Sequence, residues 1–370
     1  MPDTVLITGG AGFIGRHLAA ALLRRGHEVR VLDSLIEQVH GGRNTPADLP
    51  ADVEFLHGDI RDEAMLLRAL KGADHVVHLA AEVGVGQSMY AVDRYVSVND
   101  HGTAVLFQQL IRRPVRRVVT ASSMSIYGEG LYRDADGALH EDVLRRPRGS
   151  ADASWDPLDA QGRPLEPVPT PESKRPSLAS VYAITKYVQE RMTLTLAPAY
   201  GMEGVALRLW NVYGPGQALS NPYTGVLAIF ASRLANDERP MIFEDGRQRR
   251  DFVHVEDVAR AFLLALEHPA APGEVFNVAS GTDRSIRDVA RDLAAAMGKP
   301  IAPEITGKAR AGDIRHCIAD TRRIQHRLGF ASQRDFAADL AALASWVARQ
   351  EARDRVQQAR RELEQRGLVA

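Results

Sequence analysis

Short apolar runs alternate with helical patterns through the first half of the chain. The runs typical of strands are 4–9, 28–33, 53–59, 73–81, 115–122 and 204–210. The helical patterns between them fall at 13–25, 62–70, 99–112 and 180–196. Strands that are apolar throughout and alternate with helices predict a parallel sheet with helices on both faces. The pattern therefore predicts an α/β fold.

A glycine-rich turn joins the first strand to the first helix. In "LITGGAGFIGRHLA", Gly9, Gly12 and Gly15 form a G-x-x-G-x-x-G pattern. Such a turn lets a pyrophosphate approach backbone N–H groups at the positive end of a helix. Asp33 ends the second strand, 18 residues after Gly15. A carboxylate there accepts from a ribose 2′-hydroxyl and repels a 2′-phosphate, so the pattern predicts NAD on a Rossmann-type sheet.

Other cofactor contacts are expected beside this turn and at the ends of later strands. Phe13 and Ile14 lie within the turn. Asp59 and Ile60, in "GDI", follow the third strand and suit contact with the adenine. The motif "HLAA" follows the fourth strand and suits the inner ribose, through Leu79, Ala80 and Ala81.

The second half departs from the strand–helix rhythm. We expect a Rossmann domain at 1–211 and a smaller, discontinuous α/β substrate domain at 212–253 and 281–335, with 254–280 returning to the first domain. Residues 129–179 are rich in Pro, Asp, Arg and Gly, which predicts either an insertion near the active-site mouth or a surface ornament. A C-terminal helical tail is expected at 336–370. Its charge run is interpreted as a solvated helix face, with an oligomer contact as the alternative.

The composition of the chain mainly excludes certain classes of partner and site. The chain has 46 Lys and Arg against 47 Asp and Glu, so no basic excess exists to hold nucleic acid or an anionic membrane. One cysteine, Cys317, excludes disulfide frameworks and cysteine-based zinc sites, and we expect it to pack as a small buried residue. No metal site is predicted. The start "MPDTVLIT" has no signal-like pattern and no 18-residue apolar run follows, so we expect a cytoplasmic protein.

The stretch "SVYAITK" places Tyr182 and Lys186 four residues apart in a helical pattern, on one face of the helix. Surface helices carry many such pairs without function. Beside NAD, however, Lys186 and the positive nicotinamide would stabilise the Tyr182 phenolate and lower its pKa from about 10. Tyr182 then suits the roles of general base and acid, and Lys186 can also bind the cofactor ribose.

Taken together, "TGGAGFIG", "HLAA", Asn99, "SSMSIYG" and "YAITK" resemble the extended short-chain dehydrogenase/reductase family, in particular its nucleotide-sugar epimerases and dehydratases. The resemblance runs from Thr8 to about Arg327, with the motifs in family order. It implies that Asn99 belongs to the cofactor site. It also implies that Ser123 hydrogen-bonds the reacting hydroxyl, with Ser122 or Ser125 as substitutes.

The same resemblance assigns the substrate's diphosphate to the second half of the chain. Arg250, Arg310 and Asn211 match family residues that hold it, and a planar guanidinium suits bidentate phosphate contacts. Asn221 is a looser candidate near the sugar or base. The family also implies a homodimer, with helices near 99–112 and 182–198 packed into a four-helix bundle.

Two positions after Ser123 discriminate between reactions. The 4,6-dehydratases that the chain resembles carry an Asp-Glu pair there, which removes the C5 proton and protonates the leaving C6 hydroxyl. Met124 and Ser125 can do neither. The resemblance therefore implies 4-epimerisation, in which C4 is oxidised, the 4-keto sugar rotates and the hydride returns from a tightly bound NAD. A 3,5-epimerase of the same fold would need an additional acid/base pair, often involving a cysteine. Cys317 lies too far along the chain to match that cysteine, so this reaction is disfavoured.

Substrate identity rests on the resemblance alone. "EVGVGQSMY", "NPYTGV" and the insertion are most similar to bacterial enzymes that epimerise dTDP-L-rhamnose, a dTDP-6-deoxyhexose. An epimerase of UDP-sugars and an NAD(P)-dependent reductase or dehydratase of the same family remain alternatives. A dinucleotide-sensing module is the rival outside enzymes. Tyr182 and Lys186 weigh against the sensor, and Asp33 weighs against an NADPH-dependent reductase.

Overall fold

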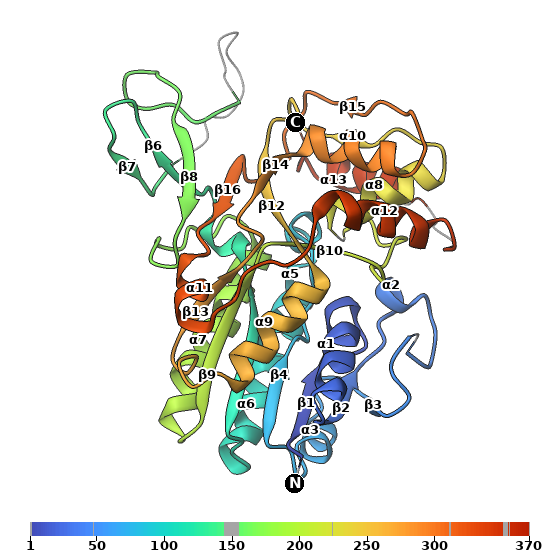
Figure 1. Ribbon diagram of the computed structural model, residues 1–370, viewed down its shortest axis with the longest axis vertical. Coiled ribbons are helices and arrows are strands. Elements are labelled where there is room, and N and C mark those ends of the chain that lie inside the picture. The colour runs from blue at the N-terminus through green and yellow to red at the C-terminus, as the bar shows by residue number, and fades with distance from the viewer. Residues whose placement is uncertain are drawn as a thin grey trace.

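A seven-stranded parallel sheet forms the centre of the computed structural model, which describes residues 2–46, 48–143, 155–223, 225–310, 312–350, 354 and 356–369 (Figure 1). The strand order is β13-β9-β5-β4-β1-β2-β3. The strands are β1 (Thr4–Thr8), β2 (Glu28–Asp33), β3 (Glu54–His57), β4 (His75–His78), β5 (Arg117–Ser123), β9 (Glu203–Leu209) and β13 (Val275–Val278). Each lies within two or three residues of its predicted position where the sequence predicted a strand.

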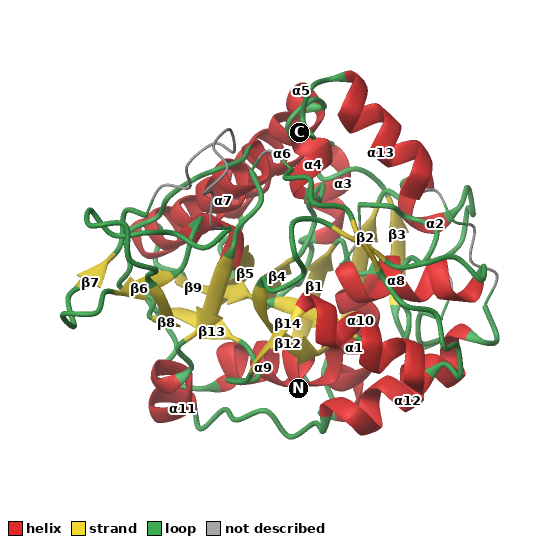
Figure 2. Cartoon of the chain, turned by 90° about the horizontal axis from the view of Figure 1, so that it is seen from above, coloured by secondary structure: helices red, strands yellow, loops and turns green. Residues whose placement is uncertain are grey.

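Helices cover both faces of this sheet, as the apolar strands predict (Figure 2). On one face, α1 (Phe13–Arg24) packs against α9 (Val255–Glu267), over a core that includes Val5 and Ile7. On the other face, Leu6 joins a second core with α3 (Glu63–Ala69), α6 (Gly102–Arg112) and α7 (Val181–Ala199). Successive side chains of β1 thus pack into the cores on opposite faces of the sheet, because side chains alternate across a strand. The predicted α/β fold with a doubly covered parallel sheet is confirmed.

The helix predicted at 99–112 begins earlier than expected. The short helix α5 (Val92–Tyr95) continues through a π-helical turn at Val96–His101 before α6 starts. A further short helix, α4 (Val85–Ser88), lies in the loop that follows β4. Such π turns often occur at functional sites, and this one carries Asn99.

A second sheet lies beside the carboxyl ends of the central strands, in the order β10-β12-β16-β8-β6-β7, with β14 paired to β12. Its strands are β10 (Asn211–Tyr213), β12 (Arg249–His254), β16 (His316–Ala319), β8 (Glu166–Thr170), β6 (Leu131–Arg133), β7 (Leu139–His140) and β14 (Asp283–Ser285). A separate core lies between α8 (Val226–Ala235), α10 (Ile286–Ala296) and α12 (Phe336–Val347). The remaining elements are α2 (Glu37–His40), β11 (Met241–Ile242), β15 (Glu304–Ile305), α11 (Arg322–Leu328), α13 (Val356–Gln365) and a 3₁₀ turn at Met124–Tyr127.

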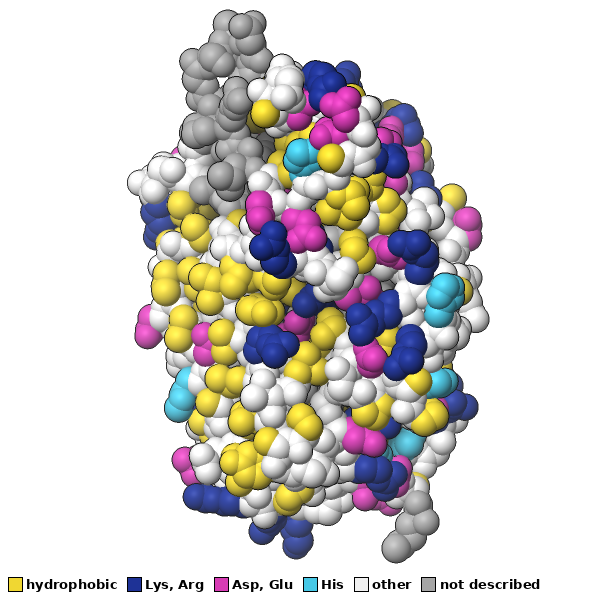
Figure 3. Space-filling view, turned by 90° about the vertical axis from the view of Figure 1, so that its left-hand side faces the viewer, with side chains coloured by type: hydrophobic (Ala, Val, Ile, Leu, Met, Phe, Trp, Pro, Cys, Tyr) yellow, Lys and Arg dark blue, Asp and Glu magenta, His cyan; other side chains and the backbone are white. Residues whose placement is uncertain are grey.

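Residues 254–280 supply elements to the central sheet. They contain α9, which packs on α1, and β13, which pairs with β9 in parallel. Cys317 lies in β16 and is fully buried, as the sequence predicted. No helix among the described residues is both long and apolar enough to cross a membrane. On the face drawn in Figure 3, acidic and basic side chains are interspersed, so that face presents no continuous basic surface.

The insertion adds strands to the second sheet, and whether it serves the active-site mouth stays a prediction. Its described parts contribute β6, β7 and β8, which extend the second sheet, while 144–154 lie outside the described residues. The ammonium group of buried Lys174 donates to the carbonyl of Tyr127 at 2.9 Å, and the Ser177 amide donates to Ile126 at 2.8 Å. The insertion therefore supports the turn after β5 from behind, a long-range role that local periodicity does not report.

The charged tail is also only partly solvated. Arg361 and Gln365 of α13 are exposed, but Ala359 and Leu363 are buried. The charge run therefore does provide a solvated face, and the opposite, apolar side of the helix is packed against the protein.

Candidate active site

A cavity of about 1600 Å³ lies at the carboxyl ends of the central strands, between the two sheets. In an open α/β sheet this edge is where ligands bind. All but one of the residues assigned to the site from the sequence line it. They are Gly9, Gly12, Phe13, Ile14, Gly15, Asp33, Asp59, Ile60, Leu79, Ala80, Ala81, Ser123, Ser125, Tyr182, Lys186, Asn211, Asn221, Arg250 and Arg310.

The glycine turn is shaped as a phosphate cradle. Gly9 has φ +69°, and a Cβ there would lie 2.7 Å from the backbone of Ala80, so a side chain is excluded. A Cβ on Gly15 would lie 2.4 Å from the backbone of Gly10, which shows how closely the turn packs on itself. A Cβ on Gly12 would instead approach only the Gly9 carbonyl, at 3.2 Å. Gly12 caps α1 without a side chain, so the helix N-terminus faces the cavity uncovered.

Asp33 has two roles in the structure. Its Oδ2 accepts from the Ala11 amide at 3.0 Å, and its Oδ1 accepts from the Leu35 amide at 2.9 Å. These bonds tie the glycine turn to the loop after β2, where Leu35 adopts a φ of +50°. The carboxylate also reaches the cavity, where it suits a ribose hydroxyl donor. The open glycine cradle and this carboxylate together fit NAD.

Asn99 is the predicted site residue that does not line the cavity. It is fully buried in the π-helical turn. Its amide oxygen accepts from the Glu82 amide at 2.7 Å, and its amide nitrogen donates to the Glu82 carbonyl at 3.1 Å and to Thr185 Oγ1 at 2.9 Å. Asn99 thus fastens the loop after β4 to α7, and its part in the cofactor site stays a prediction.

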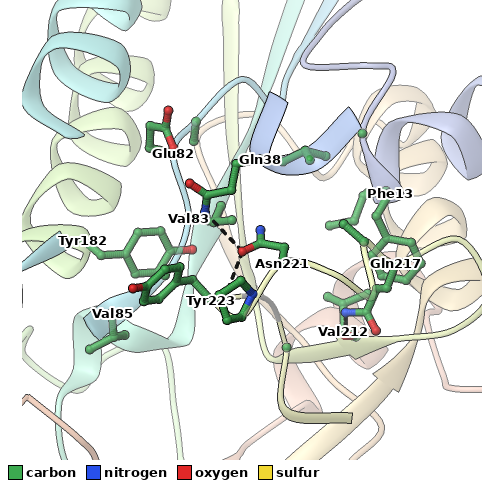
Figure 4. A pocket seen from close by; sticks show the side chains of 18 of the residues that line it. Phe13, Gln38, Glu82, Val83, Val85, Tyr182, Val212, Gln217, Asn221 and Tyr223 are labelled. Carbon is green, nitrogen blue, oxygen red and sulfur yellow. Dashed lines mark hydrogen bonds between the residues drawn. The ribbon is translucent and has the colours of Figure 1, made fainter. Parts of the chain in front are cut away.

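Tyr182 and Lys186 lie one turn apart at the start of α7, which Ser180 caps by accepting from the Ala183 amide at 3.1 Å. Both side chains reach the cavity. Figure 4 shows Tyr182 beside Glu82, Val83 and Val85 of the loop after β4. This arrangement was predicted from their four-residue spacing.

Burial dominates the electrostatics of the pair within the protein itself. Burial raises the pKa of Tyr182, and its hydrogen bond with Ser123 only partly opposes that rise. Burial also lowers the pKa of Lys186 to about 7, although Glu190 favours the charged form. The Lys186 ammonium group donates to Gln189 Oε1 at 2.6 Å. The protein groups alone therefore do not lower the pKa of Tyr182, and the predicted lowering stays an expectation for the site with NAD, whose positive nicotinamide would favour the phenolate.

The structure distinguishes Ser122 and Ser123, which end β5, from Ser125, which lies in the 3₁₀ turn after it. Ser123 Oγ accepts from the amide and the hydroxyl of Ser125, at 3.1 and 2.9 Å. Ser122 Oγ instead donates to Glu190 Oε2 at 2.6 Å. Glu190 forms a buried ion pair with Arg208. Ser122 also lines the cavity, but its hydroxyl is bonded to Glu190, so Ser123 remains the better candidate for the reacting hydroxyl.

The residues expected to hold the diphosphate reach the cavity from β10, from β12 and from the loop that carries Arg310. Arg250 donates to the carbonyls of Arg249 and Arg315, at 2.9 Å each. Arg310 pairs with Asp313 at 2.7 Å, and its guanidinium carbon lies 5.3 Å from the centre of the Phe243 ring.

Two asparagines complete this side of the cavity. Asn211 Nδ2 donates to the carbonyl of Asp251 at 3.1 Å. Asn221 Oδ1 accepts from Gln38 Nε2 at 3.1 Å and from the Tyr223 amide at 3.0 Å (Figure 4).

Several polar side chains of the cavity were missed by sequence reasoning. Arg94 Nη2 donates to Glu82 Oε2 at 2.7 Å and to Gln38 Oε1 at 3.0 Å. Since Gln38 also donates to Asn221, these side chains form one hydrogen-bonded network. Glu82 follows "HLAA" directly, so its position was a signal that went unused. The contribution of α13, through Val356, Ala359, Arg360 and Leu363, had no local signal at all.

Comparisons with known proteins agree with this site. The model of the NAD dependent epimerase/dehydratase family matches residues 5–150 and 160–279. A dTDP-L-rhamnose 4-epimerase of Burkholderia thailandensis is 35% identical, over 94% of this chain and 95% of its own. A UDP-glucose 4-epimerase of Halalkalibacterium halodurans is 30% identical, over 88% and 90%.

Among solved structures, the Thermus thermophilus UDP-glucose 4-epimerase in complex with NAD superimposes with a TM-score of 0.75 at 29% identity, covering 94% of this chain and 100% of that one. These matches and the glycine cradle confirm the resemblance seen in the motifs. The chain belongs to the NAD dependent epimerase/dehydratase family and is an NAD-dependent enzyme of that family.

Proposed function

We propose that this protein is a nucleotide-sugar 4-epimerase whose substrate is a dTDP-6-deoxyhexose such as dTDP-L-rhamnose. One observation carries the proposal. Tyr182, Lys186 and Ser123 converge on the cavity, while the positions that serve dehydration hold Met124 and Ser125. The similarity to a dTDP-L-rhamnose 4-epimerase over nearly the whole chain supports the same substrate class.

The glycine turn and Asp33 would hold NAD, with Tyr182 and Lys186 at its nicotinamide end. Bound NAD supplies the acceptor and later the donor of a hydride. Tyr182 takes the proton of the sugar's C4 hydroxyl as the C4–H bond gives up its hydride, and returns that proton once the sugar has turned. Ser123 Oγ orients the reacting oxygen. Protonated Lys186 stabilises the phenolate and binds the ribose.

The positions after Ser123 carry no acid or base that could catalyse the elimination of water from the sugar. The sulfur of Met124 carries no proton, and it lies 3.8 Å from Asn211 Nδ2. The Ser125 hydroxyl is used as a donor to Ser123. Glu82 is the nearby carboxylate in the loop after β4, and it is paired with Arg94. Oxidation and hydride return need none of these groups as acid or base.

The loop after β4 supports a 6-deoxy sugar. Gly84 and Gly86 are small, and Val83 and Val85 present apolar surface to the cavity beside Tyr182 (Figure 4). A C6 methyl group gains from contact with such surface, whereas a C6 hydroxyl would lose hydrogen bonds there. UDP-sugars form the second candidate class, because a UDP-glucose 4-epimerase is 30% identical.

The test is incubation of the purified protein with dTDP-L-rhamnose in D₂O without added NAD, with products identified by mass and proton NMR. We expect an isomer of unchanged mass, inverted at C4 and free of carbon-bound deuterium. Loss of water, or deuterium at C3 or C5, would contradict 4-epimerisation. Turnover of UDP-glucose in preference to dTDP-L-rhamnose would move the substrate to the second class, and a requirement for added NADH would indicate a reductase.

We also propose that the protein works as a cytoplasmic homodimer. Val92, Val96 and Ile184 are 45, 42 and 43% exposed on α5, the π-helical turn and α7, which contact one another. Exposed apolar groups gathered on neighbouring helices favour burial against a second copy. Light scattering coupled to size exclusion would measure the mass. An Ile184→Asp variant should dissociate the dimer, and a wild-type mass of one chain would contradict the proposal.

A further inference from the structure

The helix α13 forms one wall of the cavity. Its positions 356, 359, 360 and 363 recur at helical spacing and line the cavity together. Ala359 and Leu363 are 6 and 4% exposed, so this face of α13 is packed against the protein. The family model ends at residue 279, so α13 lies outside the part of the chain that it matches.

A cluster of two tyrosines and one carboxylate fixes the helix to the cavity loops. Glu362 Oε2 accepts from Tyr90 Oη at 2.9 Å and from Tyr223 Oη at 3.0 Å, and the two hydroxyls are 2.6 Å apart. Tyr90 follows α4 and Tyr223 follows Asn221, so both belong to loops that contribute residues to the cavity lining. The guanidinium of Arg366 lies 4.3 Å from the centre of the Tyr90 ring.

A second set of contacts joins α13 to the loop that carries Arg310. Val369 pairs with Arg310 through a backbone bridge. Lys308 Nζ lies 3.0 Å from Glu364 Oε1. A Cβ at Gly86 would lie 3.5 Å from Leu363 Cδ1 and 3.8 Å from Arg310 Cδ, so α13 and Arg310 flank the same glycine. The helix and the predicted diphosphate arginine are therefore held together.

Arg360 is the charged member of the cavity-facing stripe among the described residues of α13. Its side chain is 22% exposed. Nε lies 3.0 Å from Glu364 Oε1, a carboxylate that Lys308 shares. Nη1 lies 3.5 Å from Met241 Sδ, two residues before the Phe243 ring that Arg310 covers. Arg310 and Arg360 thus both contact residues at the end of β11.

We propose that Arg360 is a further substrate-binding residue, which acts with Arg310 on the diphosphate of the nucleotide sugar. The proposal rests on the proposed function for its substrate class, a nucleoside diphosphate joined to a sugar. A diphosphate carries negative charge on both phosphates, and a guanidinium in a partly dehydrated cavity forms charge-assisted, bidentate bonds to it. Arg360 shares the Glu364 carboxylate with Lys308, and its Nη1 lies 4.0 Å from Glu304 Oε1, so a diphosphate would compete with these two carboxylates for the guanidinium.

The experiment compares Arg360→Ala with Arg361→Ala, an exposed neighbour on the same helix that does not line the cavity. Binding of dTDP and of UDP is measured by calorimetry at two salt concentrations. The values of kcat and KM for dTDP-L-rhamnose and the amount of bound NAD are measured alongside. We expect Arg360→Ala to weaken dTDP binding and raise KM by about tenfold, because a charge-assisted hydrogen bond is lost, with kcat within about twofold and NAD content unchanged. Arg361→Ala should match the wild type.

Equal nucleotide affinity in the two variants would overturn the proposal, as would a wild type that binds neither nucleotide. Hydrogen exchange over 356–365 checks that α13 stays docked. If exchange rises in Arg360→Ala, Arg360→Gln is compared with Arg360→Lys, and the proposal requires the lysine to bind the nucleotide more tightly. Since dTDP and UDP carry no sugar, these results stand apart from the test for epimerisation, and either proposal can fail alone.

Discussion

Lys186 donates a hydrogen bond to the side-chain carbonyl of Gln189, 2.6 Å away on the next turn of α7. The Gln189 amide group donates in turn to Thr103 Oγ1 at 2.9 Å and to the Ala80 carbonyl at 3.2 Å. Gln189 is 1% exposed, so its orientation is fixed by buried partners. The acceptor of the Lys186 hydrogen bond is therefore fixed in the protein interior behind the cavity-lining Lys186.

Replacing Gln189 with Leu should weaken the charged form of Lys186. The pKa of Lys186 is already lowered to about 7 by burial, and loss of the acceptor lowers it further. Since the mechanism needs protonated Lys186, the alkaline limb of the pH profile of kcat should move to lower pH. Gln189→Glu should move it to higher pH. A profile that shifts in neither variant would show that Gln189 does not act through Lys186.

Tyr182→Phe should remove the proton acceptor without emptying the cavity. General acid–base groups contribute roughly 10²–10⁴ in rate, so kcat should fall by about that factor. NAD content and dTDP binding should persist, because the ring remains. Tyr187→Phe is the matched control, since Tyr187 lies on the same helix but does not line the cavity. Equal loss of activity in both variants would mean a structural effect.

Gly12→Ala should separate cofactor binding from folding. A Cβ there would meet only the Gly9 carbonyl, so the fold should survive while the pyrophosphate cradle is filled. Loss of one charge-assisted contact weakens NAD binding by roughly tenfold or more. Gly9→Ala should instead lower thermal stability, because φ is +69° and the Ala80 backbone lies in the way. Tight NAD binding by Gly12→Ala, measured by calorimetry, would argue against the cradle.

His78 predicts a loss of stability in acid. Burial lowers the pKa of His78 to about 3, with its ring held between Thr8 Oγ1 at 2.7 Å and Thr103 Oγ1 at 2.8 Å. The unfolded chain therefore binds a proton below about pH 6.5 that the folded chain refuses until about pH 3. Stability from this group is complete above pH 6.5 and falls as the pH drops through that window.

The measurement is the free energy of unfolding of the wild type and His78→Gln at about pH 7.5 and about pH 5.5. From the linkage relation, the wild type should lose about 1.4 kcal/mol more than the variant over this interval. All other titrating groups are common to the two proteins. An identical loss in both would show that the buried ring is protonated in the folded state.

Local patterns predicted the sheet and the cofactor half of the site. The glycine turn, Asp33 and the Tyr182–Lys186 pair each lie within one short segment, so spacing alone constrains their geometry. Long-range contacts decided the rest. Ser122 turns inward because Glu190 and Arg208 are buried beneath it, and Glu362 meets Tyr90 across 272 residues of sequence. Periodicity carries no information about such partners.

The edge position of β13 makes the two halves of the protein fold together. β13 pairs with β9 in parallel, and α9 packs on α1, although both come after much of the second region in the chain. A fragment ending near residue 211 would bare the hydrogen-bonding edge of β9 and the apolar side of α1, and such edges recruit other chains. We therefore expect the predicted Rossmann domain and the predicted substrate domain to unfold cooperatively, in a single thermal transition.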